Sequence, residues 1–390
     1  MKKILLCVLV VAVFSSMLTV AGICLLLGVD SSSAANLGRL FSAMRFIETH
    51  YVQEVERDKL IDGAISGMVR SLGDPHSVYL EPQLYSQLKA ETSGTFGGIG
   101  VYMGFENDRV YILNVIPDSP SDKVGLKAGD TILAVNSQPI SEIEYEEIVL
   151  KIRGEVGTPV ELLIHREGDE DKTYTITRDV IEVQTVLSKM LDEGIGYVRI
   201  SNFSDNTGKE FKNALNKLES ANMKGMILDL RHNPGGLITS CVEVAKEIVP
   251  AGPIVSVIQR DGTKEVYMSD LEKTKFPIAV LIDQNSASAS ELLSGALQDT
   301  KAGVVVGMKS YGKGSVQTVF PMFRDDGLKL TIAKYYTPNG RSIDGVGIVP
   351  DFEVPLENPV HMTRELNLDF ENDLQLRKAE EVLIAKLVSQ

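Results

Sequence analysis

Mainly apolar runs of strand length alternate with helical patterns over residues 181–355, and this alternation constrains the fold more than any other feature of the chain. Strands are expected at residues 196–200, 225–230, 278–282 and 304–307, and helices at residues 209–219, 240–248 and 288–299. Strands that alternate with helices favour an α/β fold in which helices cover a mainly parallel sheet. In open sheets of this kind, functional sites lie in the turns at the carboxyl ends of the strands.

One of these turns, at residues 285–291, carries the sequence N-S-A-S-A-S-E before the helical pattern at residues 288–299. A serine here would lie at the positive end of a helix, where unpaired backbone N–H groups can hold an oxyanion. The chain offers few other nucleophile sites, because its five histidines lie in no hydrolase motif and no G-x-S-x-G sequence occurs. The plainer interpretation is a capping box, since Ser288 and Glu291 fit the S-x-x-E pattern that begins many helices.

Lys313 lies between two glycines in the stretch S-Y-G-K-G-S-V-Q at residues 310–317 and is a candidate base. A lysine amine has a pKa of about 10.4, and lowering it by about 3 units requires burial that costs roughly 4 kcal/mol. The flanking glycines would let the backbone pack closely around the side chain, and Gln317 could accept a hydrogen bond from the amine. A solvated loop charge is the plainer interpretation, whereas a Walker phosphate loop is excluded because Gly314 follows the lysine.

A second glycine-rich turn, N-P-G-G at residues 233–236, follows an expected strand. Two adjacent glycines taken alone indicate only a tight turn. A triad of Ser288, His232 and Asp229 is disfavoured, because residues three apart on a strand point to opposite faces. Asp229 and Arg231 are expected to be structural polar anchors beside the turn.

The N-terminus predicts where the protein is located. Lys2 and Lys3 precede an uncharged run at residues 4–29, whose 26 residues can span a bilayer at about 1.5 Å per residue. A cleaved signal peptide has a shorter apolar core of roughly 7 to 15 residues, and residues 32–35 form only a loose cleavage site. We therefore expect a single uncleaved anchor in the cytoplasmic membrane, with the rest of the chain outside the cytoplasm. Secretion after cleavage is the alternative.

Composition argues against several classes of function. A net charge of −14 with no basic stripe disfavours nucleic acid as a partner. Of the three cysteines, Cys7 and Cys24 lie in the apolar run, so that Cys241 has no partner for an intrachain disulfide in the globular part. So few cysteines also argue against a zinc site, and no metal or other cofactor is expected.

Five separate stretches of the chain, in matching order and spacing, resemble the C-terminal processing peptidases, also called tail-specific proteases. Members of this family are Ser-Lys peptidases that carry a PDZ domain. The stretches are L-G-D-P-H-S-V-Y at residues 72–79, F-G-G-I-G-V at 96–101, L-D-L-R-H-N-P-G-G at 228–236, the segments with Ser288 and Lys313, and Y-T-P-N-G-R-S-I at 336–343. The resemblance implies an α/β protease core distantly similar to the crotonase and ClpP folds.

The resemblance also assigns roles to the candidate residues. The implied catalytic residues are Ser288 as nucleophile, Lys313 as base and Gln317 as the residue that orients the lysine. The implied oxyanion donors are the N–H of Ala289 and the N–H of either Gly235 or Gly236, and which glycine donates is left open.

Residues 124–132, V-G-L-K-A-G-D-T-I, look like part of a PDZ domain, next to β-branched runs at residues 109–115 and 160–165 and a helical pattern at residues 142–152. In that fold a glycine-rich loop binds the C-terminal carboxylate of a peptide, and the peptide adds a strand to the sheet. The matching loop and the start of the strand are Gly97, Gly98, Ile99, Gly100 and Val101. The expected partners are therefore proteins or peptides with free C-termini.

The expected organisation is α/β and multidomain. It comprises a signal anchor and linker at residues 1–35, a small helical segment at 36–93, a PDZ domain at 94–179, an α/β protease core at 180–355 and a C-terminal helical tail at 356–390. The tail suits docking or homodimer contacts better than catalysis. A PDZ module beside a protease site also suggests control by a bound C-terminus or by a regulatory protein.

Two other functions remain compatible with the sequence. One is a PDZ scaffold that binds peptides without catalysis, although the presence of Ser288, Lys313 and Gln317 together argues against it. The other is a crotonase-like acyl-CoA enzyme, which an export anchor and a peptide-binding module both disfavour.

Overall fold

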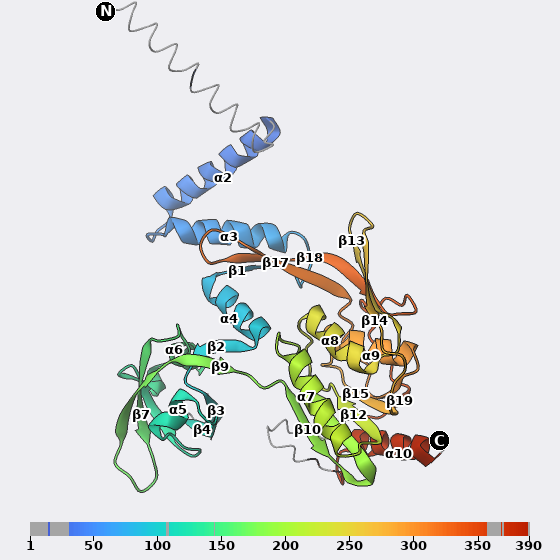
Figure 1. Cartoon of the computed structure of the whole chain (residues 1–390). Coiled ribbons are helices and arrows are strands. Elements are labelled where there is room, and N and C mark those ends of the chain that lie inside the picture. Colours follow the sequence, from blue (N-terminus) through green and yellow to red (C-terminus); the bar gives the residue numbers. More distant parts are fainter. Residues whose placement is uncertain are drawn as a thin grey trace, which may run out of the picture. The chain divides into compact units, whose positions relative to one another are not determined.

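The computed structural model describes Ser15 and residues 31–106, 109–143, 145–356, 368 and 370–388. It divides into two compact units, Met1–Glu81 and Pro82–Gln390 (Figure 1). The expected anchor at residues 4–29 lies outside the described residues, apart from Ser15. Within the described ranges, no helix combines the length and the apolar character needed to cross a bilayer.

The first unit contains the helices expected from its sequence. It consists of α2 (Ser31–His50), α3 (Arg57–Arg70) and the short strand β1 (Val78–Leu80). Arg57 Nε donates to Glu48 Oε1 at 2.7 Å and so joins the two helices. The candidate site residues all belong to the second unit.

In the second unit, α4 (Pro82–Ser93) leads into a β module in the region expected to be a PDZ domain. Its sheet has the strand order β3-β4-β5-β7-β8, and β6 (Gln138–Pro139) pairs with β5. The other elements are β3 Val101–Glu106, β4 Arg109–Val115, β5 Thr131–Val135, β7 Pro159–His165, β8 Lys172–Thr177, α5 Pro120–Val124 and α6 Tyr145–Ile152. Both predicted strands are confirmed, whereas the helix predicted from residue 142 begins at Tyr145, after a 3-10 turn at Ile140–Glu142.

A further pair of strands joins the two ends of the β module. β2 (Thr95–Gly98) and β9 (Asp179–Glu182) run antiparallel, so the segments that enter and leave the module lie side by side. Alternate side chains of β7, namely Val160, Leu162 and Ile164, are buried in the core of the module. This alternation is what a sheet with one covered face requires.

An α/β core follows, as predicted. Its sheet has the strand order β10-β11-β12-β15-β16-β19, with β10 antiparallel to β11 and the remaining neighbours parallel. The strands are β10 Val186–Met190, β11 Ile195–Ile200, β12 Gly225–Asp229, β15 Ile278–Ile282, β16 Gly303–Gly307 and β19 Phe352–Glu353. The helices are α7 Thr207–Ser220, α8 Ile238–Ile248, α9 Ala289–Asp299 and α10 Leu374–Val388. The predicted strands and helices are all present, and their ends differ from the predicted ones by at most two residues.

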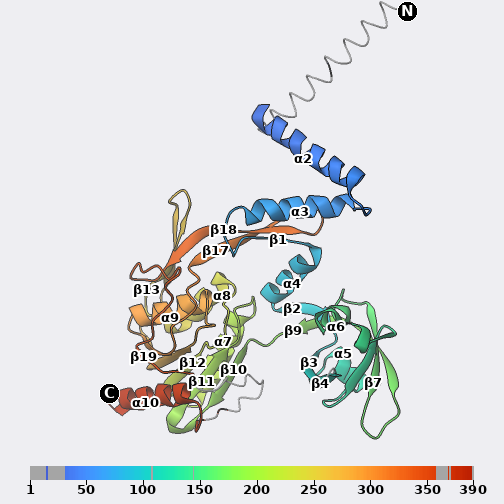
Figure 2. The same ribbon diagram turned by 180° about the vertical axis from the view of Figure 1, so that it is seen from behind.

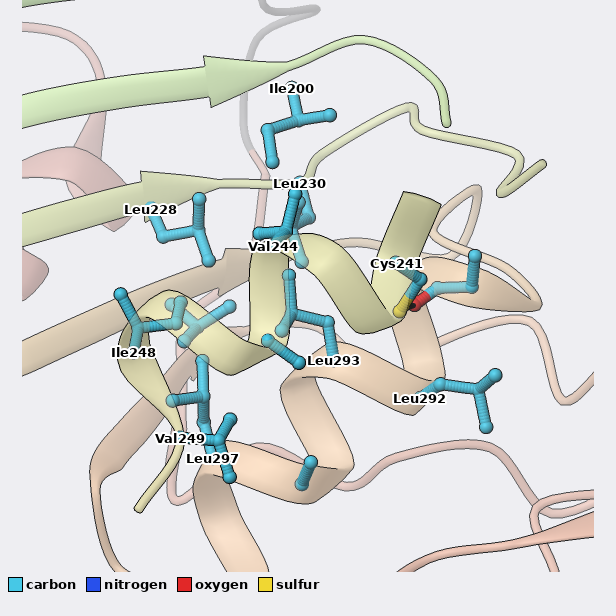
Figure 3. Packing of buried hydrophobic residues seen from close by; sticks show 14 of the residues in the cluster. Ile200, Leu228, Leu230, Cys241, Val244, Ile248, Val249, Leu292, Leu293 and Leu297 are labelled. Atoms are coloured by element: carbon cyan, nitrogen blue, oxygen red, sulfur yellow. Dashed lines mark hydrogen bonds between the residues drawn. The ribbon is translucent and has the colours of Figure 1, made fainter. Parts of the chain in front are cut away.

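The strand β12 is buried from both sides of this sheet. Leu228 belongs to a large apolar cluster with Leu293 and Leu297 of α9, to which α8 also contributes (Figure 3). Ile227 belongs to a second cluster with Leu376 of α10. Figures 1 and 2 show α10 on the side of the sheet away from α8 and α9. The turn that follows β12 is therefore fixed by helices on both faces.

A separate antiparallel sheet, which the sequence did not predict, carries the lysine segment. It has the order β17 (Ser315–Pro321), β18 (Gly327–Tyr336), β13 (Gly252–Gln259) and β14 (Lys264–Ser269). β17 begins two residues after Lys313 and contains Gln317. The hairpin of β17 and β18 thus positions both residues.

Candidate active site

Ser288 occupies a strained turn between a strand and a helix. β15 ends at Ile282, α9 begins at Ala289, and Ser288 directly precedes the helix with φ 54° and ψ −115°. A left-handed residue other than glycine costs about 1 to 3 kcal/mol and is kept only where its surroundings impose it. Hydrolases with a nucleophile elbow present their serine in such a strand-to-helix turn. Here the same turn forms without the G-x-S-x-G sequence.

Gly235 packs directly against this turn. Its φ is 102°, and a Cβ added to it would lie 2.7 Å from Ser288 Cβ and 3.0 Å from Ala289 N. A carbon cannot be accommodated that close, so the position accepts only glycine. Ala289 is fully buried, and its N–H, in the first turn of α9, has no hydrogen-bond partner among the described residues.

The two glycines of the 233–236 turn differ in what their N–H groups do. Gly235 N–H donates to Asn233 Oδ1 at 2.8 Å. Phe203 N–H donates to Gly235 O at 2.9 Å, and Leu237 N–H donates to Phe203 O at 2.8 Å. The Gly236 N–H between these two bonds therefore points away from Phe203, and it has no partner in the described part of the chain. This geometry leaves Gly236, rather than Gly235, with a donor available for a ligand.

The buried carboxylate of Glu291 joins the serine segment to the lysine segment. Its Oε2 accepts from Ser288 N–H and from Lys313 N–H, both at 2.8 Å. Its Oε1 accepts from Gly312 N–H at 2.7 Å and from the Ser310 hydroxyl at 2.5 Å. The capping-box interpretation holds for the bond to Ser288 N–H, but it is incomplete, because the same carboxylate also fixes the segment that carries the candidate base.

Tyr335, on β18, contacts both segments. Its hydroxyl donates to the carbonyl oxygen of Lys313, and the Ser288 side chain lies near enough to the phenol to act on its pKa. Burial raises the pKa of Tyr335 far above its ordinary value, so the phenol is neutral. A neutral phenol has a single proton, which goes to the Lys313 carbonyl, so the phenol oxygen can only accept from a neighbouring donor such as the Ser288 hydroxyl. Sequence reasoning missed this residue, which directly precedes the stretch at residues 336–343.

The glycines beside Lys313 allow the close packing that the sequence suggested. A Cβ on Gly314 would lie 2.4 Å from Asp344 N, and one on Gly312 would lie 3.1 Å from Gly347 N. Lys313 itself is half-buried. Removal from water disfavours the charged form of a lysine amine.

Gln317 lies on β17, four residues after the lysine. Its Nε2 donates to Ser315 Oγ at 2.8 Å and to Thr331 Oγ1 at 3.2 Å. These bonds use both N–H donors of the amide, so Oε1 is the atom left to accept from the Lys313 amine. Such an arrangement suits the orienting role that the resemblance implies.

The two serines on either side of Ser288 in the S-A-S-A-S sequence are structural. The Ser286 hydroxyl donates to Leu230 O at 2.8 Å, and the Ser290 hydroxyl donates to Asn233 O at 3.0 Å. Both bonds tie the start of α9 to the turn that follows β12.

His232 is paired with a residue that sequence reasoning did not consider. It has φ 58°, its N–H donates to Asp283 Oδ1 at 3.0 Å, and its imidazole pairs with the other oxygen of the same buried carboxylate. Asp229 instead binds Arg231, with Oδ2 2.6 Å from Arg231 Nη2. No Ser288–His232–Asp229 triad forms, as the strand geometry predicted.

The carboxylate of Asp229 belongs to a buried network behind the turn. It accepts from the Tyr197 hydroxyl at 2.6 Å as well as from Arg231. Burial acts to raise the pKa of Asp229, but the Arg231 guanidinium outweighs it and holds the pKa below its usual range. Asp229 and Arg231 are therefore a charged structural pair, as expected.

The expected carboxylate-binding residues lie in the β module and not in the α/β core. Gly97 and Gly98 end β2, Ile99 is buried, Gly100 has φ 81° and Val101 begins β3. β3 stands at one end of the sheet order, so one of its edges is open among the described strands. An open edge beside a glycine turn is what strand addition by a peptide requires.

Comparison with known proteins decides the family. The chain is 36% identical over 355 residues to the carboxy-terminal processing protease CtpB of Bacillus subtilis (strain 168), covering 88% of this chain and 74% of that protein. The chain belongs to the carboxy-terminal processing protease family. It is also 39% identical over 329 residues to a carboxy-terminal-processing protease of Bartonella bacilliformis, covering 82% of this chain and 74% of the relative.

The parts of the chain match separately. Residues 194–354 match peptidase family S41, residues 86–165 match the PDZ domain, and residues 28–83 match the N-terminal domain of the activating protease CtpB. A putative S41 protease from Bacteroides fragilis NCTC 9343 has the same fold, with a TM-score of 0.50, 15% identity and coverage of 82% of this chain and 90% of that one. The predicted PDZ domain and α/β protease core are thus confirmed, and the chain is a serine-type carboxy-terminal processing protease.

Proposed function

We propose that this protease is a membrane-anchored, extracytoplasmic endopeptidase that captures protein C-termini with its PDZ domain and cleaves them with a Ser288–Lys313 dyad. The observation that carries the proposal is the shared carboxylate oxygen of Glu291, which accepts from Ser288 N–H and Lys313 N–H at 2.8 Å each. One buried acceptor thereby brings together the backbones of a strained serine and a glycine-flanked lysine. A binding scaffold without catalysis would need neither the strained turn nor this connection.

The reaction follows from the groups around Ser288. Its Oγ attacks the carbonyl carbon of the substrate while its proton passes to the neutral amine of Lys313. The oxyanion that forms is held by the N–H groups of Ala289 and Gly236, which have no partner among the described residues. The intermediate collapses to an acyl-serine ester, and the leaving amine takes the proton from Lys313. Water then attacks the ester, with Lys313 again as base, and releases the serine.

Two features support the roles of Lys313 and Gln317. The lysine is half-buried between Gly314, where packing leaves no room for a Cβ, and Gly312, whose φ of 96° disfavours any other residue. Gln317 donates both of its amide N–H groups, to Ser315 and to Thr331. Its carbonyl oxygen is therefore available to another donor. We assign that oxygen to the Lys313 amine, so that the lone pair of the neutral amine is directed at Ser288.

Substrate capture rests on the PDZ domain. The turn that ends in Gly100 and the open edge of β3 support binding of an extended C-terminus, with N–H groups of residues 98–101 on its carboxylate. The uncharged run at residues 4–29 supports anchoring in the cytoplasmic membrane with the protease outside the cytoplasm. The substrate class is then extracytoplasmic protein with an accessible C-terminus.

The test is degradation of an unstructured protein with an apolar C-terminus by the full chain in detergent. Wild type should degrade it, whereas Ser288→Ala and Lys313→Met should be inactive and should still bind a C-terminal peptide with wild-type affinity. Full activity in Ser288→Ala would show that the nucleophile is another residue. Peptide binding without cleavage by the wild type would favour the scaffold.

A further inference from the structure

The start of the C-terminal helix α10 reaches Arg231, beside the active-site turn, through the side chains of Asp373 and Gln375. Its apolar side, with Leu376 and Leu383, packs on the face of the sheet that holds Tyr197 and Ile227. Asp373, the residue directly before the helix, caps it: Oδ1 accepts from Leu376 N–H at 2.9 Å. The same carboxylate also faces the interior of the core, where it binds a second partner.

That inward contact is with Arg231, whose side chain is 1% exposed. Arg231 Nη1 lies 2.9 Å from Asp373 Oδ1 and 2.8 Å from Asp373 Oδ2. It also donates to Gln375 Oε1 at 3.3 Å. Asp229 takes the opposite side of the guanidinium, through Nε at 3.0 Å and Nη2 at 2.6 Å. The arginine is thus held between the carboxylate of Asp229 at the end of β12 and the carboxylate of Asp373 just before α10.

Arg231 also lies near the start of the segment that leads from β12 to the glycines. It follows the strand β12 by two residues, and its own N–H donates to Asp229 Oδ1 at 2.9 Å. The next residue, His232, is left-handed and is bound to Asp283 on the α9 side. The segment therefore leaves the sheet anchored on two faces, by α10 at residue 231 and by the turn before α9 at residue 232. Gly236 lies only five residues beyond Arg231.

We infer that Asp373 is a positioning residue for the catalytic site, which acts through Arg231 to hold the N–H of Gly236 where the oxyanion forms. The inference deepens the proposed function and rests on it for its catalytic part. A shift of about 1 Å in the position of a catalytic group relative to the reacting atoms can lower a rate by roughly 100-fold. Asp373 need not touch substrate to have such an effect, because Arg231 transmits its position to the turn.

The test uses the full chain with Asp373→Ser. Serine keeps a capping oxygen at the start of α10 but is uncharged and too short to reach Arg231. We expect kcat to fall about 10- to 100-fold while KM stays within a factor of two. Asp373→Asn, which keeps the cap and one acceptor but loses the charge, should give an intermediate loss.

Leu383→Ala is the matched control, because it loosens the packing of α10 without touching Arg231. It should lower the melting temperature at least as much as Asp373→Ser and leave kcat within a factor of three. If both variants lose the same kcat, α10 merely stabilises the fold and the inference is wrong.

A second readout does not depend on activity. Hydrogen exchange of the amides at residues 231–233 and 235–237 should rise in Asp373→Ser and not in Leu383→Ala. Unchanged exchange there would overturn the inference even if the protease is active. If the wild type proves inactive, the proposed function fails, and the exchange comparison alone decides whether Asp373 positions the turn.

Discussion

Replacing Glu291 by glutamine gives the sharpest test of how the site is assembled. The carboxylate accepts four hydrogen bonds, two at each oxygen. A glutamine can keep one acceptor oxygen, but its NH₂ group must then face the donors of the other pair. The Ser310 hydroxyl can reverse and accept from that NH₂ group, whereas Gly312 N–H cannot. We therefore expect the amide to turn its NH₂ toward Ser310 and Gly312.

The free-energy cost of Glu291→Gln follows from this orientation of the amide. Leaving Gly312 N–H buried without an acceptor costs about 1 to 3 kcal/mol. The bonds from Ser288 N–H and Lys313 N–H persist to a neutral oxygen and each weaken by roughly 1 kcal/mol. The total of about 3 to 5 kcal/mol is a large part of the roughly 5 to 15 kcal/mol that stabilises a typical domain. A loss of about 3 kcal/mol in the positioning of the two segments corresponds to roughly a 100-fold fall in kcat/KM.

The assay is peptide hydrolysis at a temperature where the variant is folded, together with urea unfolding. Leu292→Ala is the control: Leu292 is buried in the same helix, and its truncation costs about 2 to 5 kcal/mol without changing a hydrogen bond to Ser288 or Lys313. Glu291→Gln should lose far more activity than Leu292→Ala at similar stability. If it keeps more than a third of the wild-type kcat/KM, the carboxylate is only a helix cap and the reasoning is refuted.

Three further predictions concern single residues. Tyr335→Phe removes the bond to the Lys313 carbonyl and the hydroxyl beside Ser288 but keeps the ring, so kcat should fall about 10-fold at constant KM; a higher rate would mean that the phenol restrains the serine at rest. Gly235→Ala should abolish acylation by an active-site serine reagent, because its Cβ would lie 2.7 Å from Ser288 Cβ; normal labelling would contradict this contact. Burial raises the pKa of the Cys241 thiol from 9.0 to about 12, so the folded state should favour the protonated thiol. The free energy of unfolding should therefore be at its full value below about pH 9 and fall by about 1.4 kcal/mol per pH unit above it. Thermal unfolding from pH 8 to 11 in wild type and Cys241→Ala measures this, and parallel curves would contradict it.

Much of the α/β core was predictable because its signals are local. Ile278–Ile282 is a continuous apolar run, and α9 begins at the residue that follows Ser288, next to the predicted start. A strand buried on both faces and an amphipathic helix each show in their own sequence. The antiparallel sheet gave no such signal. Along β18 most side chains are only partly buried, so its sequence lacks the alternation that marks a strand with one covered face.

The parts of the site that sequence reasoning missed depend on contacts between distant segments. Glu291 was noticed as part of a capping box, yet its bonds to Ser310, Gly312 and Lys313 cross about 20 residues of chain. Tyr335 reaches Ser288 only because β18 pairs with β17 beside the lysine segment. The choice between Gly235 and Gly236 likewise depended on the side chain of Asn233, which occupies one of the two N–H groups.

The buried carboxylate of Glu291 also sets an energy scale for switching this protease off. Any inactive state that withdraws the lysine segment must break the bonds from Gly312 N–H and Lys313 N–H to a buried charge, each contributing about 1.5 to 3 kcal/mol. Unless new partners replace them, such a state is disfavoured by roughly 3 to 6 kcal/mol, a population of the order of one molecule in a hundred to one in ten thousand. A regulator that holds the protease inactive must therefore supply at least that much binding energy. A regulator that activates the protease needs only to remove the contact that holds the lysine segment away.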